Sequence, residues 1–463
     1  MGRRRVIVTA ATVVAVVGLG AGYVAADGAG VVPGPFTTAA PWPTPEPFPT
    51  PSPAAGAPVP LVLRSLDEAA PTPTAAALQS ALDALRSAPE VGTPPGVLVV
   101  DVATGETVTA ADETTARLPA STTKVLTAAA AVATLDLTAT LPTTARLQGA
   151  DELVLVGGGD IALAAGAGDP TAVVGRAGLG DLAAATATAL AGRGVTSVSL
   201  GVDDSLFGGG QLAPGWSSID YTGGFVAPVQ PLGIDVGLIA GRDQRDTDPA
   251  DSAARVFAEA LRAQGIEVRE GPSRRTAAAD ATELARVESA SIGEILDLAM
   301  ADSDNTLTEV IGRLVAVEAE QPATFDGAAT AILAAIANLG VDVSGTSLND
   351  ASGLSSSNRV SPRLLTDLLL VGATNPAMRE LALSLPVAGL EGTLTNRDLD
   401  AGQVRAKTGT LPGVVSLAGY TVTADGRALA FTVMADGVPT AGSYAARLEV
   451  DEWVRTLTAC GCS

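Results

Sequence analysis

The chain of 463 residues is acidic, because 50 aspartates and glutamates outnumber 28 basic residues and give a formal net charge of −22. Such a charge repels phosphates, so nucleic acid is excluded as a partner. The sequence has no histidine, which removes Ser-His-Asp and Cys-His triads and imidazole metal sites. No metal or cofactor is expected. With 47% hydrophobic residues, the chain can form one large domain or two to three smaller ones.

The N-terminus has the pattern of an export signal. Three arginines, Arg3 to Arg5, precede an apolar run from Val6 to about Ala26. A positive start, an apolar stretch and small residues at its end are typical of a signal peptide, and the run is also about long enough to span a bilayer. We interpret residues 1–26 as a signal peptide or a membrane anchor. Residues 27–73 are rich in proline and predict an extended linker.

Patterns at both ends of the remaining chain predict one antiparallel sheet flanked by helices. In chain order they are a helix over 74–87, a hairpin of 97–100 and 107–109, an alanine-rich helix opening at Pro119, a hairpin of 414–422 and 428–434, and a helix over 444–457. The Asp425-Gly426 step is a typical hairpin turn. The fold class is therefore α+β, with one domain formed by residues 74–139 and 289–463.

The middle of the chain, residues 140–288, predicts a large α/β insertion with its own core. Strand patterns occupy 153–156 and 198–202, and helix patterns occupy 182–191 and 250–264. Two glycine runs, at 157–159 and 208–210, lack the lysine of a phosphate-binding loop and are interpreted as turns. Because both flanks belong to one domain, we expect the insertion to be removable without unfolding the rest.

The two cysteines, Cys460 and Cys462, stand at the C-terminus with one glycine between them. They are too few for a thiolate metal site. A strained disulfide remains open, but we expect a pair of surface thiols without a role.

The chain has only two lysines, and both stand in short motifs. Lys124 closes the S-x-x-K motif that begins at Ser121, and Lys407 opens a K-T-G motif. A lysine can lose its proton when it is desolvated or placed near another cation, whereas a guanidinium effectively cannot. In a chain without histidine, lysine is the remaining candidate for the base that activates a serine nucleophile.

A third motif, Ser303-Asp304-Asn305, follows a helix that begins with a capping box at Ser291 and Glu294. Each of the three motifs is weak when taken alone, but their conjunction in this order is specific for serine acyl transfer.

The spacing of the motifs suggests how they work together. Residues three apart share a helix face, so Lys124 points its amine at Ser121. The charge of Lys407 and burial both favour the neutral form of Lys124. Ser303 can relay a proton, and Asn305 can hold the amide of a substrate. The backbone N–H groups of Ser121 and Thr410 would form an oxyanion hole.

On these motifs the chain resembles the class C low-molecular-mass penicillin-binding proteins, which are D-alanyl-D-alanine carboxypeptidases and endopeptidases. The segment Asp350–Ser355 and the long insertion support the resemblance, which runs from about Thr74 to the C-terminus. One departure is local: Ser356 stands where similar proteins often carry arginine, and Arg359 comes later.

The resemblance implies a transpeptidase-like domain, with a helical subdomain, that is interrupted by inserted domains. It also implies roles for the motif residues. The catalytic residues would be Ser121, the acylated nucleophile, Lys124, the base, and Ser303, Asn305 and Lys407. Lys407 and Thr408 would bind the terminal carboxylate of the substrate, and the substrate-binding residues would be Thr408, Gly409 and Thr410.

The expected function is that of a serine DD-peptidase that cleaves D-Ala-D-Ala, and also peptide cross-links, in peptidoglycan stem peptides and that binds β-lactams covalently. It would act outside the cytoplasm, in the cell-wall space or on the outer face of the cytoplasmic membrane. Membrane contact is expected only through the N-terminal segment if it stays uncleaved.

Two alternatives remain. A serine β-lactamase shares all three motifs, but compact enzymes of that kind place S-D-N much closer to S-x-x-K. A non-catalytic receptor for wall peptides or penicillin is opposed by the complete set of catalytic residues.

Overall fold

The computed structural model describes residues 20–27 and 69–460. The chain divides into two units, Met1–Leu63 and Arg64–Ser463. Of the predicted signal or anchor and the linker, only 20–27, which are helical, and the last residues of the linker are described. Within the described ranges, no helix is both long and apolar enough to cross a membrane.

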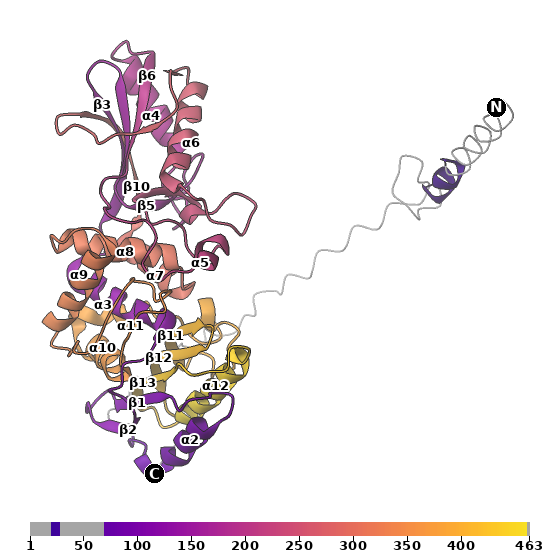
Figure 1. Ribbon diagram of the computed structural model, residues 1–463, viewed down its shortest axis with the longest axis vertical. Helices are drawn as coiled ribbons and strands as arrows, with labels where there is room; N and C mark the ends of the chain where they lie inside the picture. Colours follow the sequence, from indigo (N-terminus) through magenta and orange to yellow (C-terminus); the bar gives the residue numbers. More distant parts are fainter. Residues whose placement is uncertain (1–19, 28–68, 461–463) are drawn as a thin grey trace, which may run out of the picture. The chain divides into compact units, whose positions relative to one another are not determined.

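The second unit contains a five-stranded sheet in which every neighbouring pair is antiparallel (Figure 1). Its order is β11 (Val404–Leu411), β12 (Val414–Val422), β13 (Ala428–Ala435), β1 (Gly96–Asp101) and β2 (Thr107–Ala111). Successive side chains of a strand point to opposite faces. In β13, Leu429 and Phe431 therefore pack in one core, and Ala430 and Met434 pack in the other. The predicted antiparallel sheet is confirmed.

Two helices from the ends of the unit cover one face of this sheet. They are α2 (Ala75–Ser87) and α12 (Ser443–Ala459), and both match the sequence predictions. Leu78 and Leu82 of α2 pack with Val450 and Trp453 of α12 in the same core as Phe431. Helix α2 can supply these contacts because its leucines recur every three to four residues and form one stripe.

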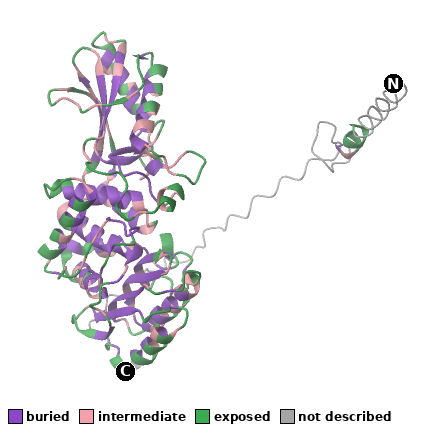
Figure 2. Cartoon of the chain, viewed as in Figure 1, coloured by how far each residue is buried: buried purple, intermediate pink, exposed green. Residues whose placement is uncertain are grey.

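The other face of the sheet meets a helical layer that positions the site. Its members are α3 (Lys124–Thr134), α7 (Ile292–Ala301), α8 (Asn305–Glu318), α9 (Phe325–Asn338), α10 (Pro362–Thr374) and α11 (Arg379–Leu383). Helix α3 is buried from Lys124 to Ala131, which is possible because alanines fill most of that stretch and let neighbouring helices approach closely. In Figure 2 this layer is largely purple, so the site rests on a rigid, packed support.

The middle segment forms a second sheet of its own. Its order is β10 (Thr282–Ser291), β3 (Thr140–Gln148), β4 (Glu152–Gly157), β6 (Ser197–Asp203) and β8 (Glu267–Val268), with β9 (Ser273–Arg274) paired to β6. Strands β4 and β6 are parallel, and helices α4 (Leu179–Ala191) and α6 (Pro249–Ala263) pack in the same core. These features confirm the α/β character expected of the middle segment, and both glycine runs end strands or lie in loops.

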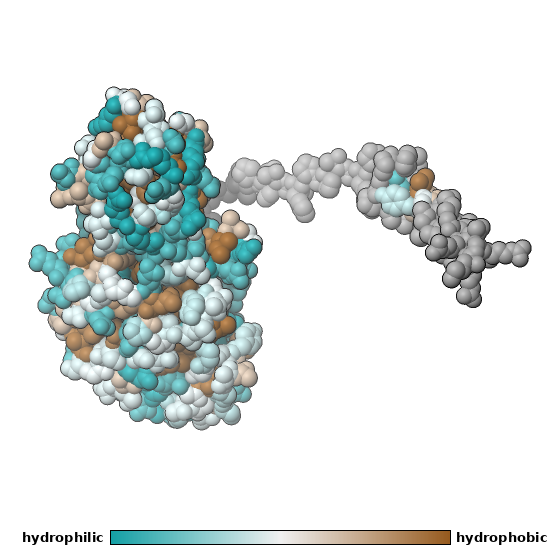
Figure 3. Space-filling view, turned by 45° about the horizontal axis from the view of Figure 1, so that its top comes forward, coloured by the Kyte–Doolittle hydropathy of each residue, from teal (hydrophilic) through white to brown (hydrophobic). Residues whose placement is uncertain are grey.

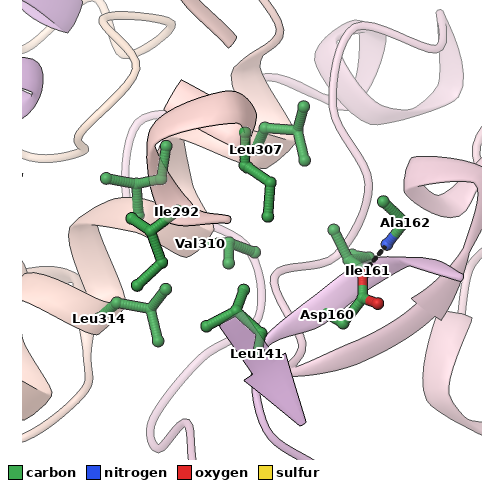
Figure 4. Close-up of a pocket in the computed structure, with 11 residues that line it drawn as sticks. Leu141, Asp160, Ile161, Ala162, Ile292, Leu307, Val310 and Leu314 are labelled. Carbon is green, nitrogen blue, oxygen red and sulfur yellow. Dashed lines mark hydrogen bonds between the residues drawn. The ribbon is translucent and has the colours of Figure 1, made fainter. Parts of the chain in front are cut away.

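Part of this segment packs on the helical layer as well as on the second sheet. Strands β5 (Asp160–Leu163) and β7 (Leu232–Ile234) pair with each other, and α5 (Ser218–Thr222) lies between them in sequence. Figure 4 shows the junction, where Leu141 and Ile161 face Ile292, Val310 and Leu314. The cavity there is only about 10 Å³, which is too small for a ligand. The junction is therefore a packed core.

The hydropathy of the surface differs between the second sheet with its helices and the rest of the unit. Figure 3 shows a mostly hydrophilic face on the second sheet and its helices, with apolar patches over the rest of the unit. Within residues 140–288, the exposed large apolar side chains are Leu212, Ile219 and Phe225. All three belong to the stretch that adjoins the helical layer.

Cys460 is disulfide-bonded, so the expectation of a free surface thiol at this position is wrong. Cys462 lies outside the described residues.

Asp101 at the end of β1 and Arg427 in the turn between β12 and β13 form a buried ion pair. Arg427 donates through Nε to Asp101 Oδ2 at 2.6 Å and through Nη2 to Oδ1 at 2.8 Å, and the side chains are only 6% and 0% exposed. Burial alone would raise the pKa of Asp101, but hydrogen bonds from Arg427 and Thr72 lower it below its ordinary value.

Replacing Arg427 by methionine should destabilise the fold by about 3–5 kcal/mol, because it leaves the Asp101 carboxylate buried without this cation. The loss should show in denaturant unfolding at neutral pH. The lowered pKa means that this stabilisation exists above the unfolded pKa of about 3.9 and disappears as pH falls through the folded value. Arg455→Met, which removes an exposed ion pair with Asp398, should cost at most about 1 kcal/mol. Equal losses in the two variants would contradict the argument.

Candidate active site

Ser121 lies in a short 3-10 helix, η1 (Ala120–Thr123), that leads into α3. The prediction of one continuous α-helix from Pro119 is therefore wrong at its first turn. Two hydroxyls bond back to earlier carbonyls, Thr122 to Pro119 O at 2.7 Å and Thr123 to Ala120 O at 2.9 Å. Such local bonds compete with regular α-helix hydrogen bonding. Ala120 has a φ of +49°, a strained value for a residue with a Cβ.

Lys124 is fully buried and contacts three motif segments at once. Its Nζ lies 3.1 Å from Ser121 Oγ, 2.6 Å from Asn305 Oδ1 and 2.8 Å from the carbonyl oxygen of Ser352. Burial lowers the pKa of Lys124 to about 8, although the nearby carboxylates of Asp350, Glu309 and Asp304 act to raise it. A large fraction of the amine is therefore neutral at mildly alkaline pH.

Lys407 is also fully buried, on β11. Its Nζ donates to the carbonyl oxygen of Thr408 at 3.1 Å. Burial and then the charge of Lys124 lower the pKa of Lys407 well below its ordinary value. The two lysine charges thus oppose each other, as expected from the motifs, and burial is the largest cause that lowers the pKa of Lys124.

The second motif lies at the turn between α7 and α8. Ser303 has a φ of +58°, and Asp304 caps α8 by accepting a hydrogen bond from Leu307 N at 2.8 Å. Asn305 starts α8, and its side chain bridges two segments, because Oδ1 accepts from Lys124 and Nδ2 donates to the carbonyl oxygen of Phe225 at 3.0 Å. Arg245 pairs with Asp304 at 2.9 Å. The middle segment thus contacts both polar residues at the start of α8.

The K-T-G segment comes next to Ser121 because β11 is an edge strand of the five-stranded sheet. A Cβ on Gly409 would lie 2.1 Å from Ser416 Oγ and 2.7 Å from Pro119 O, so only glycine permits this close approach. Thr408 donates its hydroxyl to Thr393 Oγ1 at 2.9 Å. Thr410 is exposed at the far end of the motif.

These segments enclose a pocket of about 340 Å³. Its lining residues are Ser121, Ser303, Thr393, Arg397, Thr408, Thr410 and Arg447. Four of the seven were predicted from sequence. The other three come from the loop before β11 and from α12, and no local pattern marks them.

The two arginines give the pocket a positive wall. Arg397 donates through Nε to both carboxylate oxygens of Asp451 at 2.9 Å, and both side chains are almost fully buried. Arg447 stacks 4.7 Å above the ring of Tyr444, and among the described residues its buried Nε has no hydrogen-bond acceptor. Two guanidiniums against one carboxylate leave a net positive charge that suits an anionic group.

The segment Asp350–Ser355 packs against Lys124 and the turn that carries Ser121. Asp350 accepts hydrogen bonds from the backbone N–H of Gly353 at 2.9 Å and of Ser355 at 2.6 Å, and from Trp216 Nε1 at 2.8 Å. Gly353 has a φ of +83°, and a Cβ there would lie 1.9 Å from Ala120 O. This glycine therefore lets the segment touch the turn that carries Ser121.

A serine hydroxyl beside a buried lysine amine, in a pocket with a second serine and a threonine-bearing edge strand, is the arrangement of a serine acyl-transfer enzyme. Comparisons with known proteins agree. The family model described as the D-Ala-D-Ala carboxypeptidase 3 (S13) family matches residues 78–246 and 242–457, and the chain belongs to that family.

Individual relatives extend over most of the chain. The carboxypeptidase DacB of Mycolicibacterium smegmatis is 36% identical over 412 residues, which cover 86% of this chain and 87% of that protein. A D-alanyl-D-alanine carboxypeptidase of an Actinomadura species is 29% identical over 451 residues, with coverages of 78% and 81%. The crystal structure of penicillin binding protein 4 from Haemophilus influenzae has a TM-score of 0.68 and 21% identity, and the match covers 82% of this chain and 99% of that one. The family and the fold expected from the motifs are confirmed.

Proposed function

We propose that this protein is a serine DD-peptidase that cleaves the D-Ala-D-Ala bond of peptidoglycan stem peptides through an ester on Ser121. The observation that carries the proposal is the 3.1 Å approach of Lys124 Nζ to Ser121 Oγ, inside a pocket that Ser303 and Thr410 also line. Membership of a carboxypeptidase family supports the choice of substrate.

Acylation would begin when Ser121 Oγ attacks the carbonyl carbon of the penultimate D-alanine. Neutral Lys124 takes the hydroxyl proton, and the carbon–nitrogen bond of the scissile amide breaks. Ser303 relays the proton to the departing amine, which leaves as D-alanine. Backbone N–H groups of Ser121 and Thr410 would stabilise the oxyanion. Water then hydrolyses the ester and frees Ser121.

Substrate binding would use the edge strand and the positive wall. The terminal carboxylate of the substrate would bind near Lys407 and Thr408, where it supplies a negative partner to a buried amine. Gly409 lets β11 approach the nucleophile, and Thr410 and Asn305 would hold the peptide backbone. Arg447 adds positive charge to the wall of the pocket. The same chemistry with a β-lactam would yield a stable covalent adduct.

We further infer that the domain division follows the two sheets, with residues 74–139 and 289–463 forming the catalytic domain and 140–288 inserted. Because its substrate is part of the cell wall, the protein would act outside the cytoplasm, attached to the membrane only if the N-terminal segment stays uncleaved.

Incubating the protein with a D-Ala-D-Ala peptide should release D-alanine, and a labelled penicillin should modify the wild type. Ser121→Ala should lose both activities, because no other nucleophile stands beside Lys124 in the described site. Persistent labelling of the variant would contradict the role of Ser121. Rapid hydrolysis of penicillin without D-alanine release would favour a β-lactamase, and binding of the peptide without release would favour a receptor.

A further inference from the structure

Glu309 is a buried carboxylate next to the site that the proposed reaction does not use. It lies on α8 four residues after Asn305, so the two share a helix face, and it is only 1% exposed. The Asn305 end of this face contacts Lys124. A carboxylate in such a position is costly to bury unless it is hydrogen-bonded.

The hydrogen bonds of Glu309 go to the backbone of the segment behind Lys124. Both of its carboxylate oxygens accept from Ala351 N at 3.1 Å, and Oε1 accepts from Ser352 N at 2.8 Å. The carbonyl groups of the same two residues turn to α3: Ser352 O accepts from Lys124 Nζ at 2.8 Å, and Ala351 O accepts from Thr127 Oγ1 at 2.6 Å. The 351–352 backbone thus connects Glu309 to the lysine.

No arginine or lysine of the described chain forms an ion pair with Glu309 at salt-bridge distance. Burial and then the neighbouring Asp350 raise its pKa to about 8, against the backbone hydrogen bonds, which lower it. A carboxylate kept there without a direct cation is a poor choice for stability alone, because an apolar side chain of similar volume would avoid its desolvation. Its contacts point instead to the reaction.

We propose that Glu309 is a positioning residue that holds Lys124 in line with Ser121 through the 351–352 backbone. The inference rests on the proposed function, in which Lys124 activates Ser121. Without the carboxylate, two backbone N–H groups would be left buried and unpaired, and the Ser352 carbonyl would lose the bond that fixes its direction toward Lys124.

The charge of Glu309 adds a second, separable effect. The ionisable groups that face Lys124 are Asp350 from the segment behind it, Asp304 and Glu309 at and within α8, and Lys407 on β11. Glu309 acts to raise the pKa of Lys124. Glu309 carries this charge fully only above its own pKa of about 8. Removing the charge should lower the pKa of Lys124 in that range, so the acylation rate should reach its maximum at a lower pH than in wild type.

The test compares Glu309→Gln, Glu309→Asp and wild type for the rate of acylation by a chromogenic cephalosporin, at pH values on both sides of 8. Glu309→Gln keeps one acceptor oxygen but sets an amide NH2 group against Ala351 N, where Oε2 now accepts. It should therefore acylate more slowly at its optimum by about tenfold or more, since small misplacement of a catalytic group is costly. Its acid limb should shift to lower pH. Glu309→Asp keeps the charge and shortens the reach, so its rate should fall while its acid limb stays close to that of wild type.

Glu318→Gln is the matched control, because Glu318 is exposed at the end of the same helix; it should behave as wild type. A Glu309→Gln variant with the wild-type rate overturns the proposal, and so does a slower variant whose acid limb does not move, because that result describes a purely structural role. If Glu309→Gln fails to fold, Glu309→Asp decides by its rate alone, and a wild-type rate for Glu309→Asp overturns the proposal. Absence of acylation in wild type would instead refute the proposed function.

Discussion

Lys124→Arg should reduce the rate of Ser121 acylation by at least about a hundredfold, the usual scale of general-base catalysis. The guanidinium has no accessible neutral form, so it cannot accept the serine proton. The larger head group must also replace an amine that is already bonded to Ser121, Asn305 and the Ser352 carbonyl. The rate is measured with a labelled penicillin under single-turnover conditions.

If Lys124 is the base, the direction in which the acylation rate changes with pH can be predicted. Lys124 acts as a base only in its neutral form, and its pKa is lowered to about 8. Acylation by wild type should therefore rise as pH increases through about 8 and decline below it, as the amine gains a proton.

Lys407→Arg is the comparison variant, because Lys407 is expected to act as a cation once the carboxylate of the substrate is bound. Arginine keeps that charge but changes its shape and donor geometry, so activity should fall while some remains. If Lys124→Arg acylates nearly as fast as wild type, or if Lys407→Arg is the more damaged of the two, Lys124 is not the base.

The sequence predicted those parts of the site whose residues lie close together in the chain. Ser121 and Lys124 are three residues apart, and Lys407 to Thr410 are consecutive, so each motif carries its own geometry once its helix or strand forms. The capping box at Ser291 likewise specifies the start of α7. What these local patterns could not provide is the first turn before α3, where Thr122 and Thr123 bond to the backbone and replace the α-helix with a 3-10 helix.

Residues that reach the site through tertiary packing escaped prediction. Arg447 lies on α12, a helix whose other side chains help to build the core. Nothing in its sequence context distinguishes it from a surface arginine. Glu309 sits in a helix pattern where a charged residue is normally taken for the solvent side. Only the fold shows that this position faces Lys124, because the register of α8 against α3 depends on packing between segments some 180 residues apart, as in the Lys124–Asn305 contact.

The middle segment illustrates the same limit at a larger scale. Its strands and helices were visible as patterns, but its contacts with the helical layer were not. The carbonyl oxygen of Phe225 accepts a hydrogen bond from the side chain of Asn305, and the backbone N–H of Ala227 donates to the hydroxyl of Thr306. Arg245 pairs with Asp304. These contacts support the S-x-N turn from a segment that sequence reasoning treated as separate from the site.

Deletion of residues 140–288, joined by a Gly/Ser linker, should therefore abolish the folded protein, contrary to the expectation from sequence. Ile161, Val229 and Val236 are each at most 6% exposed in the same core as α3 and α8. The deletion would uncover the apolar surface of α3 and α8 that these side chains now cover. At about 1.5–3 kcal/mol for each buried contact surface of this size, the loss is roughly 5–9 kcal/mol, against a typical net stability of about 5–15 kcal/mol. The readouts are cooperative unfolding and penicillin labelling.

Two point variants separate the role of the junction from that of the inserted sheet. Val229→Ala opens the core shared with α8, whereas Leu190→Ala opens the core between α4 and the second sheet. Each removes a buried apolar side chain and should cost a few kcal/mol, about 2–5 for the leucine. Val229→Ala should slow acylation, because Val229 lies on the segment that holds the S-x-N turn, and Leu190→Ala should leave the acylation rate of the folded protein unchanged. A deletion protein that unfolds cooperatively and still reacts with penicillin would show that the catalytic domain needs no support from the insertion.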